Sequence, residues 1–372
     1  EKGMNCDTDG FDAEMQKQKD RSKSAAKTET SDWKILIEDE VEEFVGYKKF
    51  ESDIKITRYR KVQTAEETTF QLVFNLTPFY AEGGGQVGDT GCIKNEKECI
   101  EILDTKKENN VIIHFVKELP KKLKVTFTAM VDADSRISTA RNHTATHLLH
   151  ESLQEILGEH VQQKGSLVCA DYLRFDFSHF SKLSDEKLSK IKESVNAKIL
   201  NNITLTEHNN MPLSEAKNEG AMMLFGEKYT DVVRMIQFDS SKELCGGTHV
   251  NATGEIGLFK IISESSTAAG IRRIEAITGI DAYQLDKQTE GSLNKIANLT
   301  KSNDIAQTVE KVTQLLKNKK NLEKQIATFQ KQLASGQDDE LTSKAIEVNG
   351  VKILATEVSD VGAKDLRDLA DK

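Results

Sequence analysis

Two pairs of potential metal ligands, far apart in the sequence, constrain most strongly how this chain folds. In "RNHTATHLLH", His143 and His147 are four residues apart, which places both imidazoles on one face of a helix. In "ELCGGTHV", Cys245 and His249 enclose two glycines, which permit a tight turn. Zinc prefers four nitrogen or sulfur ligands. The sequence therefore predicts a fold that brings this helix and this turn together around one metal ion.

Other roles for these residues compete with a metal site. A lone helical histidine is more often a structural residue than a ligand, although two pairs of ligands make that interpretation weaker. A metalloprotease needs Glu in His-Glu-x-x-His, and Thr144 stands in that place, so the general base is absent. A further alternative makes His150 the third helical ligand and Cys245 a nucleophile. The spacing of Cys245 and His249 favours a zinc-bound thiolate, but the alternative stays open.

The composition indicates a globular protein with a charge-rich surface. The 372 residues suffice for two or three domains, and no apolar run reaches the roughly 20 residues needed to cross a bilayer. Five cysteines without framework spacing favour a reducing, cytoplasmic environment. With a net charge of −9, an RNA partner would need a local basic surface. The first residues show neither a signal peptide nor an initiator Met, and we expect a piece of a longer protein.

The residue pattern changes several times along the chain and predicts five successive domains or segments. Short alternating segments separated by glycines indicate a small β-barrel or sheet, and later segments mix helices with strands. We expect a linker at 1–30, the β-barrel at 31–133, a zinc-containing core at 134–281, a helical region at 282–336 and the start of a C-terminal domain at 337–372.

Two helices of the expected core carry signals at their ends. We expect the first to begin at an N-cap formed by Asp134 or Ser135 and to end at Leu157, before Gly158. The second, amphipathic helix lies in "SDEKLSKIKESVNAKIL" and has Ser184 as its N-cap.

Apolar residues at three- and four-residue spacings predict long helices from about Ala282 until Gly336 ends them. The spacing is interrupted near Lys319, so coiled-coil pairing and a helical hairpin both stay open. Beyond them, Asn349 and Gly350 predict a β-hairpin with a type I′ turn.

Long motifs stand in order along nearly the whole chain: "FDAEMQKQKDRSKSA", "TPFYAEGGGQVGDTG", "NHTATHLLHESLQEILGEHVQQKGSLV", "LRFDFSH" and "CGGTHVNATGEIGLFKIISESSTAAGIRRIEA". Together they resemble the alanyl-tRNA synthetase family. The resemblance implies an α+β fold: a small β-barrel, then an α+β zinc-containing editing core, then long antiparallel or coiled-coil helices and the start of a C-terminal α/β domain. It implies that this region hydrolyses tRNA(Ala) wrongly charged with serine or glycine. The aminoacylation domain, which uses ATP and Mg²⁺, would lie upstream.

The resemblance also implies roles for individual residues. Gln163 matches a glutamine that editing requires, although its setting between Gln162 and Lys164 alone favours a turn. Thr77 matches a position linked to recognition of the serine hydroxyl, and Gly83 stands where many relatives have Ser. The implied zinc ligands are His143, His147, Cys245 and His249; the implied pocket loop contains Gly84, Gly85 and Gln86; candidates for tRNA contact are Lys164, Arg174, Arg272 and Arg273.

A second hydrolytic site has a physical reason in this family. A pocket for alanine excludes glycine or serine by only about 1–3 kcal/mol of binding free energy. A threonine hydroxyl that bonds the serine side chain would favour serine over alanine. Zinc could activate water or orient the substrate, but four protein ligands leave no open position, so a structural zinc stays open as well.

The expected partner is the acceptor end of tRNA(Ala), and the helical region implies a homodimer, with no DNA or membrane partner. Two other classes remain: a free-standing editing hydrolase, and an inactive binding module that keeps zinc for folding. The synthetase-like linker and the long helices disfavour the first. The four ligands together with Gln163 argue against the second, and turnover is the observation that separates them.

Overall fold

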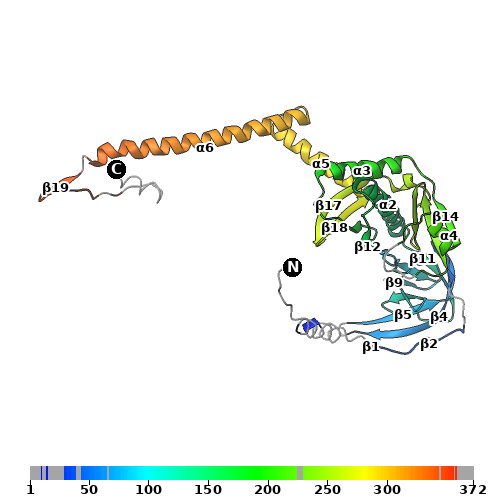
Figure 1. Ribbon diagram of the computed structural model, residues 1–372. Helices are drawn as coiled ribbons and strands as arrows, with labels where there is room; N and C mark the ends of the chain where they lie inside the picture. The colour runs from blue at the N-terminus through cyan, green and yellow to red at the C-terminus, as the bar shows by residue number, and fades with distance from the viewer. Residues whose placement is uncertain are drawn as a thin grey trace. The chain divides into compact units, whose positions relative to one another are not determined.

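The computed structural model describes residues 10, 14–15, 29–38, 43–64, 67–223, 229–342, 345–355 and 357. The chain separates into two compact units, Glu1–Leu285 and Asp286–Lys372. Figure 1 shows their elements, with several sheets and few helices in the first unit. Most of the expected linker at 1–30 lies outside the described residues.

The N-terminal portion of unit 1 is a sheet of nine strands, as the alternating segments predicted. Its order is β8-β7-β11-β4-β5-β10-β9, and β1 and β2 both pair with β4. Its inward residues, among them Ile54, Leu72 and Phe127, form one buried apolar cluster. The strands are β1 (Glu29–Thr30), β2 (Lys34–Ile35), β4 (Glu51–Gln63), β5 (Thr68–Phe74), β7 (Gly91–Lys94), β8 (Cys99–Ile102), β9 (Asp104–Glu108), β10 (Val111–Val116) and β11 (Thr126–Val131).

The expected closed barrel is not formed by the described strands. The sheet path ends at β8 and β9, which do not pair with each other. Only Leu103 separates them, and its N–H donates to Phe115 O at 2.8 Å. Antiparallel neighbours need a turn of about two residues or more, so these consecutive strands cannot form a ladder together. A separate parallel pair, β3 (Glu43–Phe44) and β6 (Leu76–Thr77), lies outside this path.

The C-terminal portion of unit 1 packs helices against a four-stranded antiparallel sheet. The sheet has the order β12-β13-β18-β17 and contains β12 (Gln163–Val168), β13 (Leu173–Ser178), β17 (Phe259–Ala268) and β18 (Ile271–Thr278). Helices α2 (Ala133–Leu157) and α3 (Asp185–Leu200) share its apolar core, which includes Leu149, Phe175, Phe177, Ile191 and Ile274.

The ends of both helices follow local chemistry. Ser184 caps α3, as predicted, because its hydroxyl accepts from Lys187 N at 3.3 Å. The predicted N-cap of α2 was wrong: Asp132, rather than Asp134 or Ser135, accepts from the N–H of Ser135 at 3.1 Å. Gly158 follows α2 as predicted, with a φ of 113° that favours glycine.

A smaller three-stranded sheet with the order β14-β15-β16 completes unit 1. Its apolar cluster contains Ala216, Val233, Met235 and Leu244. The elements are β14 (Thr206–Pro212), α4 (Leu213–Asn218), β15 (Val232–Phe238), β16 (Ser241–Leu244) and the short 3₁₀ helix η1 (Thr253–Ile256).

Unit 2 contains most of α5 (Gly279–Leu299), all of α6 (Ile305–Thr342) and a hairpin of β19 (Ile346–Val348) and β20 (Val351–Ile353). Gly336 does not end α6, contrary to the prediction, since a helix tolerates glycine at a cost of about 1 kcal/mol. Asn349 and Gly350 have φ of 53° and 82°, as the predicted type I′ turn requires. No helix in the described ranges is long and apolar enough to span a membrane.

Candidate metal centre

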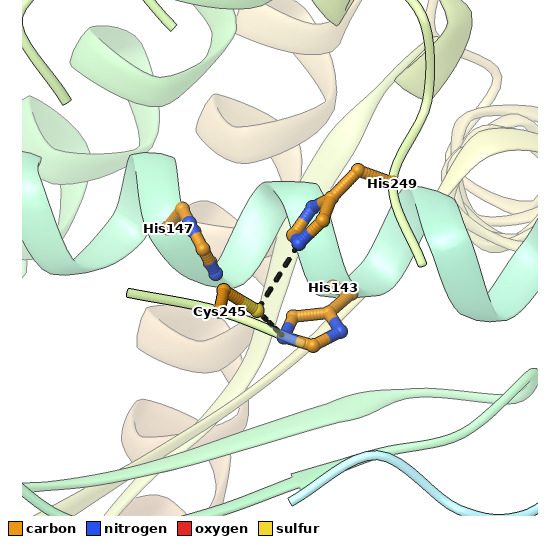
Figure 2. Close-up of side chains that lie close together, drawn as sticks. All are labelled: His143, His147, Cys245 and His249. Atoms are coloured by element: carbon orange, nitrogen blue, oxygen red, sulfur yellow. Dashed lines mark hydrogen bonds between the residues drawn. The ribbon is translucent and has the colours of Figure 1, made fainter. Parts of the chain in front are cut away.

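Four side chains that the sequence pairs predicted to meet do meet in the first unit. Helix α2 contributes His143 and His147, and the turn after β16 contributes Cys245 and His249. Their potential ligand atoms all lie within 4.8 Å of one another. Cys245 Sγ is 3.5 Å from His143 Nε2 and 3.3 Å from His249 Nε2, and Figure 2 shows the side chains converging. This His₃Cys cluster could hold a metal ion.

Hydrogen bonds fix which nitrogen of two histidines faces the cluster. The Nδ1 of His143 is 2.7 Å from Gln86 Oε1, an oxygen that only accepts, so Nδ1 carries the proton. Its Nε2 therefore presents a lone pair to the cluster. The Nδ1 of His249 is 3.0 Å from Thr144 Oγ1, which likewise directs its Nε2 toward Cys245. Such outer partners orient the ligands of metal sites.

Burial keeps these imidazoles neutral. It lowers the pKa of His143 to about 3, and the nearby His147 adds to the shift. Burial also lowers the pKa of His147 and holds the pKa of His249 well below its usual range. A neutral imidazole has the free lone pair that a metal ligand needs. The three imidazoles are therefore already in the protonation state that binds a cation.

Gln86 reaches the cluster because the glycine-rich loop lies against β12. Gly84 and Gly85 have φ of 58° and 81°, and Gly85 O accepts from Val168 N at 2.7 Å. Gln86 Oε1 also accepts from Thr248 N at 2.9 Å, while its amide donates to Thr248 Oγ1 at 3.0 Å. One buried glutamine thus connects the glycine-rich loop to a helical histidine and to the Cys-x₃-His turn.

The turn itself is held by two side chains that the sequence did not single out. Arg234 donates to Cys245 O at 3.0 Å and to Gly247 O at 2.9 Å, and Tyr47 Oη donates to Gly246 O at 2.7 Å. A Cβ on Gly247 would lie 2.0 Å from His143 Cε1. Glycine is required there so that turn and helix can approach closely.

His150 does not join the cluster, so the alternative with three helical ligands is not what the structure shows. Its Nδ1 lies 3.4 Å from Glu243 Oε1, and the other carboxylate oxygen lies 3.5 Å from His147 Nε2. Glu243 is thus a buried carboxylate beside the cluster, which sequence reasoning missed. The only signal was an acidic residue two positions before Cys245.

Thr77 and Gln163 lie in other strands, and no described contact joins them to the four ligands. Thr77, in β6, has two hydrogen bonds. Its hydroxyl donates to His114 Nε2 at 2.8 Å, because His114 Nδ1 faces the carbonyl of Leu72. The same hydroxyl accepts from Phe79 N at 3.1 Å.

Gln163 begins β12, at the opposite end from Val168, which contacts the glycine-rich loop. The roles of Thr77 and Gln163 remain predictions.

Three of the four candidates for tRNA contact are already paired with carboxylates. Arg272 bonds Glu264, whereas Arg273 bonds Asp176 at 2.6 Å. The register places Arg272 opposite the core residue Phe177 and Arg273 opposite Asp176, so the two arginines project from opposite faces of the sheet.

The other two candidates also have partners. Arg174 lies 3.8 Å from the same Asp176, and Lys164 donates to Gln162 Oε1 at 3.2 Å.

Comparison with known proteins agrees with these motifs. Residues 1–137 match the family model described as "tRNA synthetases class II (A)", and residues 233–275 match "Threonyl and Alanyl tRNA synthetase second additional domain". The second match includes Cys245 and His249.

Curated relatives named alanine–tRNA ligase align along almost the whole chain. The one from Flavobacterium psychrophilum is 49% identical over 99% of the chain, and that from Bacteroides fragilis is 50% identical over 95%. That from Porphyromonas gingivalis is 43% identical over 100% of the chain. The chain spans 40–42% of the length of these relatives. Over the segment that it spans, this chain belongs to the alanyl-tRNA synthetase family.

Proposed function

We propose that this region of the protein is an editing site that hydrolyses tRNA(Ala) wrongly charged with serine or glycine, and that the longer protein ligates alanine to tRNA(Ala). One observation carries the proposal: in a chain of this family, four ligands from two distant segments converge in a buried His₃Cys cluster. A ligase whose substrate differs from serine by one hydroxyl needs such a second site, because binding alone discriminates by only about 1–3 kcal/mol.

The donor set fits zinc. One thiolate and three neutral imidazoles are the ligands that Zn²⁺ takes in tetrahedral sites, and their mutual distances of up to 4.8 Å leave room for a central ion. His143, His147, Cys245 and His249 would hold it, and bound zinc would supply Lewis-acid chemistry at the ester. Arg234 keeps the turn in place for this set by bonding Cys245 O and Gly247 O.

Thr77 is the residue proposed to recognise the serine side chain. Its hydroxyl uses its one proton on His114 and one lone pair on Phe79 N, which leaves one acceptor position. Serine can donate to that position and alanine cannot. Gln163, Gly84 and Gly85 complete the proposed pocket. The proposed domain boundaries are 1–30, 31–133, 134–281, 282–336 and 337–372.

The proposed partner is tRNA(Ala), bound through its acceptor end. ATP and Mg²⁺ would serve only the aminoacylation domain of the longer protein. A homodimer through the helical region is also proposed, because α6 exposes apolar residues that include Val309, Leu315, Leu322 and Phe329.

Deacylation of Ser-tRNA(Ala), with Ala-tRNA(Ala) alongside, tests the proposal. We expect rapid loss of serine, sparing of alanine, and loss of the reaction in His143→Ala or after chelation. The matched control is His208→Ala, which removes a histidine of β14 that bonds Gln237, outside the cluster. Hydrolysis of neither substrate by a correctly folded, zinc-loaded protein would overturn the proposed activity.

A purely structural zinc is the second candidate, and the closed set of four protein ligands favours it. It predicts that cobalt or cadmium substitution leaves the deacylation rate unchanged. A rate that changes with the metal would instead assign the ion a role in the reaction.

A further inference from the structure

A short loop of unit 1 combines exposed aromatic and basic side chains. Residues 45–50, "VGYKKF", connect β3 to β4. Tyr47 and Phe50 are each 42% exposed, and Lys48 and Lys49 between them are exposed as well. Aromatic rings interleaved with cations are the surface that single-stranded nucleic acids bind, by stacking of bases and pairing of phosphates.

The loop is held firmly beside the metal centre. Tyr47 Oη donates to Gly246 O at 2.7 Å, within the Cys245–His249 turn, and the Arg234 guanidinium lies 4.0 Å from the centre of its ring. Arg136 donates to Gly46 O at 2.7 Å. A Cβ on Gly46 would lie 2.2 Å from Pro78 O, so the loop fits closely against its neighbours. A ring anchored in this way loses little conformational freedom when a ligand stacks on it.

The same loop also adjoins the strand of Thr77, the proposed reader of serine. Val45 N donates to Thr77 O at 2.9 Å, and Phe44 pairs with Thr77 in the parallel ladder of β3 and β6. The loop therefore touches both the metal-binding turn and the proposed specificity strand.

The lysines of the loop are available for phosphates. Neither Lys48 nor Lys49 forms an ion pair with any residue in the described ranges. By contrast, Arg272 and Arg273, which the sequence suggested for tRNA contact, already bond Glu264 and Asp176. Phosphate binding by those arginines would compete with existing ion pairs, whereas binding by the lysines would not.

We propose that the loop 45–50 binds the single-stranded 3′ end of the tRNA, with Tyr47 stacking on a base and Lys48 and Lys49 contacting phosphates. The inference rests on the proposed editing function. It deepens that proposal by naming the surface that would hold the aminoacylated 3′ end beside the metal centre. Stacking is sequence-tolerant and phosphate contact depends on salt, so the two contributions can be measured separately.

The test compares the affinity for tRNA(Ala) with the affinity for the same tRNA lacking its single-stranded 3′ end. We expect the double variant Lys48→Ala/Lys49→Ala to bind the intact tRNA more weakly. The slope of the logarithm of the binding constant against the logarithm of the salt concentration should become shallower by about 1.4, at about 0.7 per phosphate contact. Tyr47→Leu should lower the affinity for intact tRNA roughly 5- to 150-fold. For each variant, removing the 3′ end should cause a smaller further loss of affinity than it causes in wild type. Lys121→Ala/Lys122→Ala is the control and should match wild type. This exposed pair lies elsewhere in the β domain, the portion of unit 1 that contains the nine-stranded sheet.

Tyr47→Phe separates stacking from a structural role, because it keeps the ring and removes the bond to Gly246 O. It should bind intact tRNA more tightly than Tyr47→Leu does, because the ring that stacks is kept. The proposal is overturned if the loop variants lower the affinity for truncated and intact tRNA equally, or if their affinities match that of the control. It is also overturned if Tyr47→Phe loses as much affinity for intact tRNA as Tyr47→Leu does. Binding is measured without hydrolysis, so a failed deacylation assay on wild type would count against the proposed function alone.

Discussion

At the scale of single residues, Gln86 is the strongest link between the glycine-rich loop and the cluster. We predict that Gln86→Met, which keeps the volume and removes the hydrogen bonds to His143 and Thr248, weakens zinc binding by about 10- to 100-fold. Competition with a chromophoric chelator measures it. The control is Gln71→Met, a second buried glutamine of the β domain that bonds Arg60 instead. Equal affinity of Gln86→Met and wild type would show that His143 is oriented without this partner.

His114 gives a prediction about pH that is independent of the metal ligands. Burial lowers its folded-state pKa to about 3, against an ordinary value near 6.5. Between these values the unfolded chain binds the proton and the folded protein does not, so stability falls as the pH drops below about 6.5. His114→Gln removes the titrating group. Between pH 7 and pH 5 the wild type should therefore lose about 2 kcal/mol more unfolding free energy than the variant.

Urea unfolding at both pH values measures this difference. His208→Gln, on β14, controls for the general effect of removing a histidine and should follow the wild type. If His114→Gln also loses as much stability as the wild type, the buried imidazole is not what makes the fold sensitive to acid.

The four potential ligands could be predicted from the sequence because each pair reports its own local geometry. A helical spacing of four and a turn with two glycines are both short-range signals. Glu243 and Tyr47 carried no such signal, since each acts on an element that is distant in sequence. Gln86 was named only through the family resemblance, as part of the pocket loop and not as a partner of His143. Outer partners of a site depend on tertiary packing, which a spacing pattern does not contain.

At the scale of elements, helix α2 is fixed to the β domain by one buried arginine. Arg136 donates to Asp89, to Gly46 O and to Pro78 O, two turns before His143 on the same helix. Arg136→Met should lower the unfolding free energy by about 3–5 kcal/mol, because it leaves Asp89 buried without its cation. Denaturant unfolding measures the loss.

The control for that variant is Arg141→Met, on the same helix, which loses one bond to Glu255 O and should cost far less. Comparable losses from the two substitutions would mean that the Arg136–Asp89 pair adds no special stability. Zinc affinity should also fall in Arg136→Met, because the loop containing Gln86 and the helix containing His143 would no longer be clamped together.

The elements were predicted well where one residue decides the outcome and less well where neighbours compete. Asn349–Gly350 has no local rival for its role in the hairpin turn. Asp132 and Asp134 stand two residues apart in "DADS", and only the end of β11 at Val131 makes Asp132 the cap of α2. Barrel closure likewise depends on which strands meet, and the alternation of residues within each strand does not determine that.

At the scale of the whole molecule, helix α6 of the second unit carries an exposed apolar stripe that no other described residue covers. Leu315, Leu322 and Phe329 recur every seven residues and are 58%, 57% and 61% exposed. A heptad stripe of this kind pairs with another helix in a coiled coil. Self-association through α6 is therefore the expected state of the protein in solution.

The interruption at Lys319 makes this association testable in both directions. Lys319 occupies the inward heptad position between Val312 and Ile326, where a charged residue costs stability but selects register and oligomeric state. Lys319→Leu should tighten the dimer by roughly tenfold or more, as burial of an added leucine contributes about 1.5–3 kcal/mol. Leu322→Lys should weaken it by a similar factor. Sedimentation equilibrium at several concentrations measures both constants.

The same substitution on the outward face supplies the control. Lys317 stands at a heptad position that points away from the stripe, so Lys317→Leu should leave the dissociation constant unchanged. If Lys317→Leu and Lys319→Leu tighten association equally, added hydrophobicity rather than heptad pairing is responsible. If the wild type stays monomeric at every concentration and Lys319→Leu does too, α6 does not pair with a second copy.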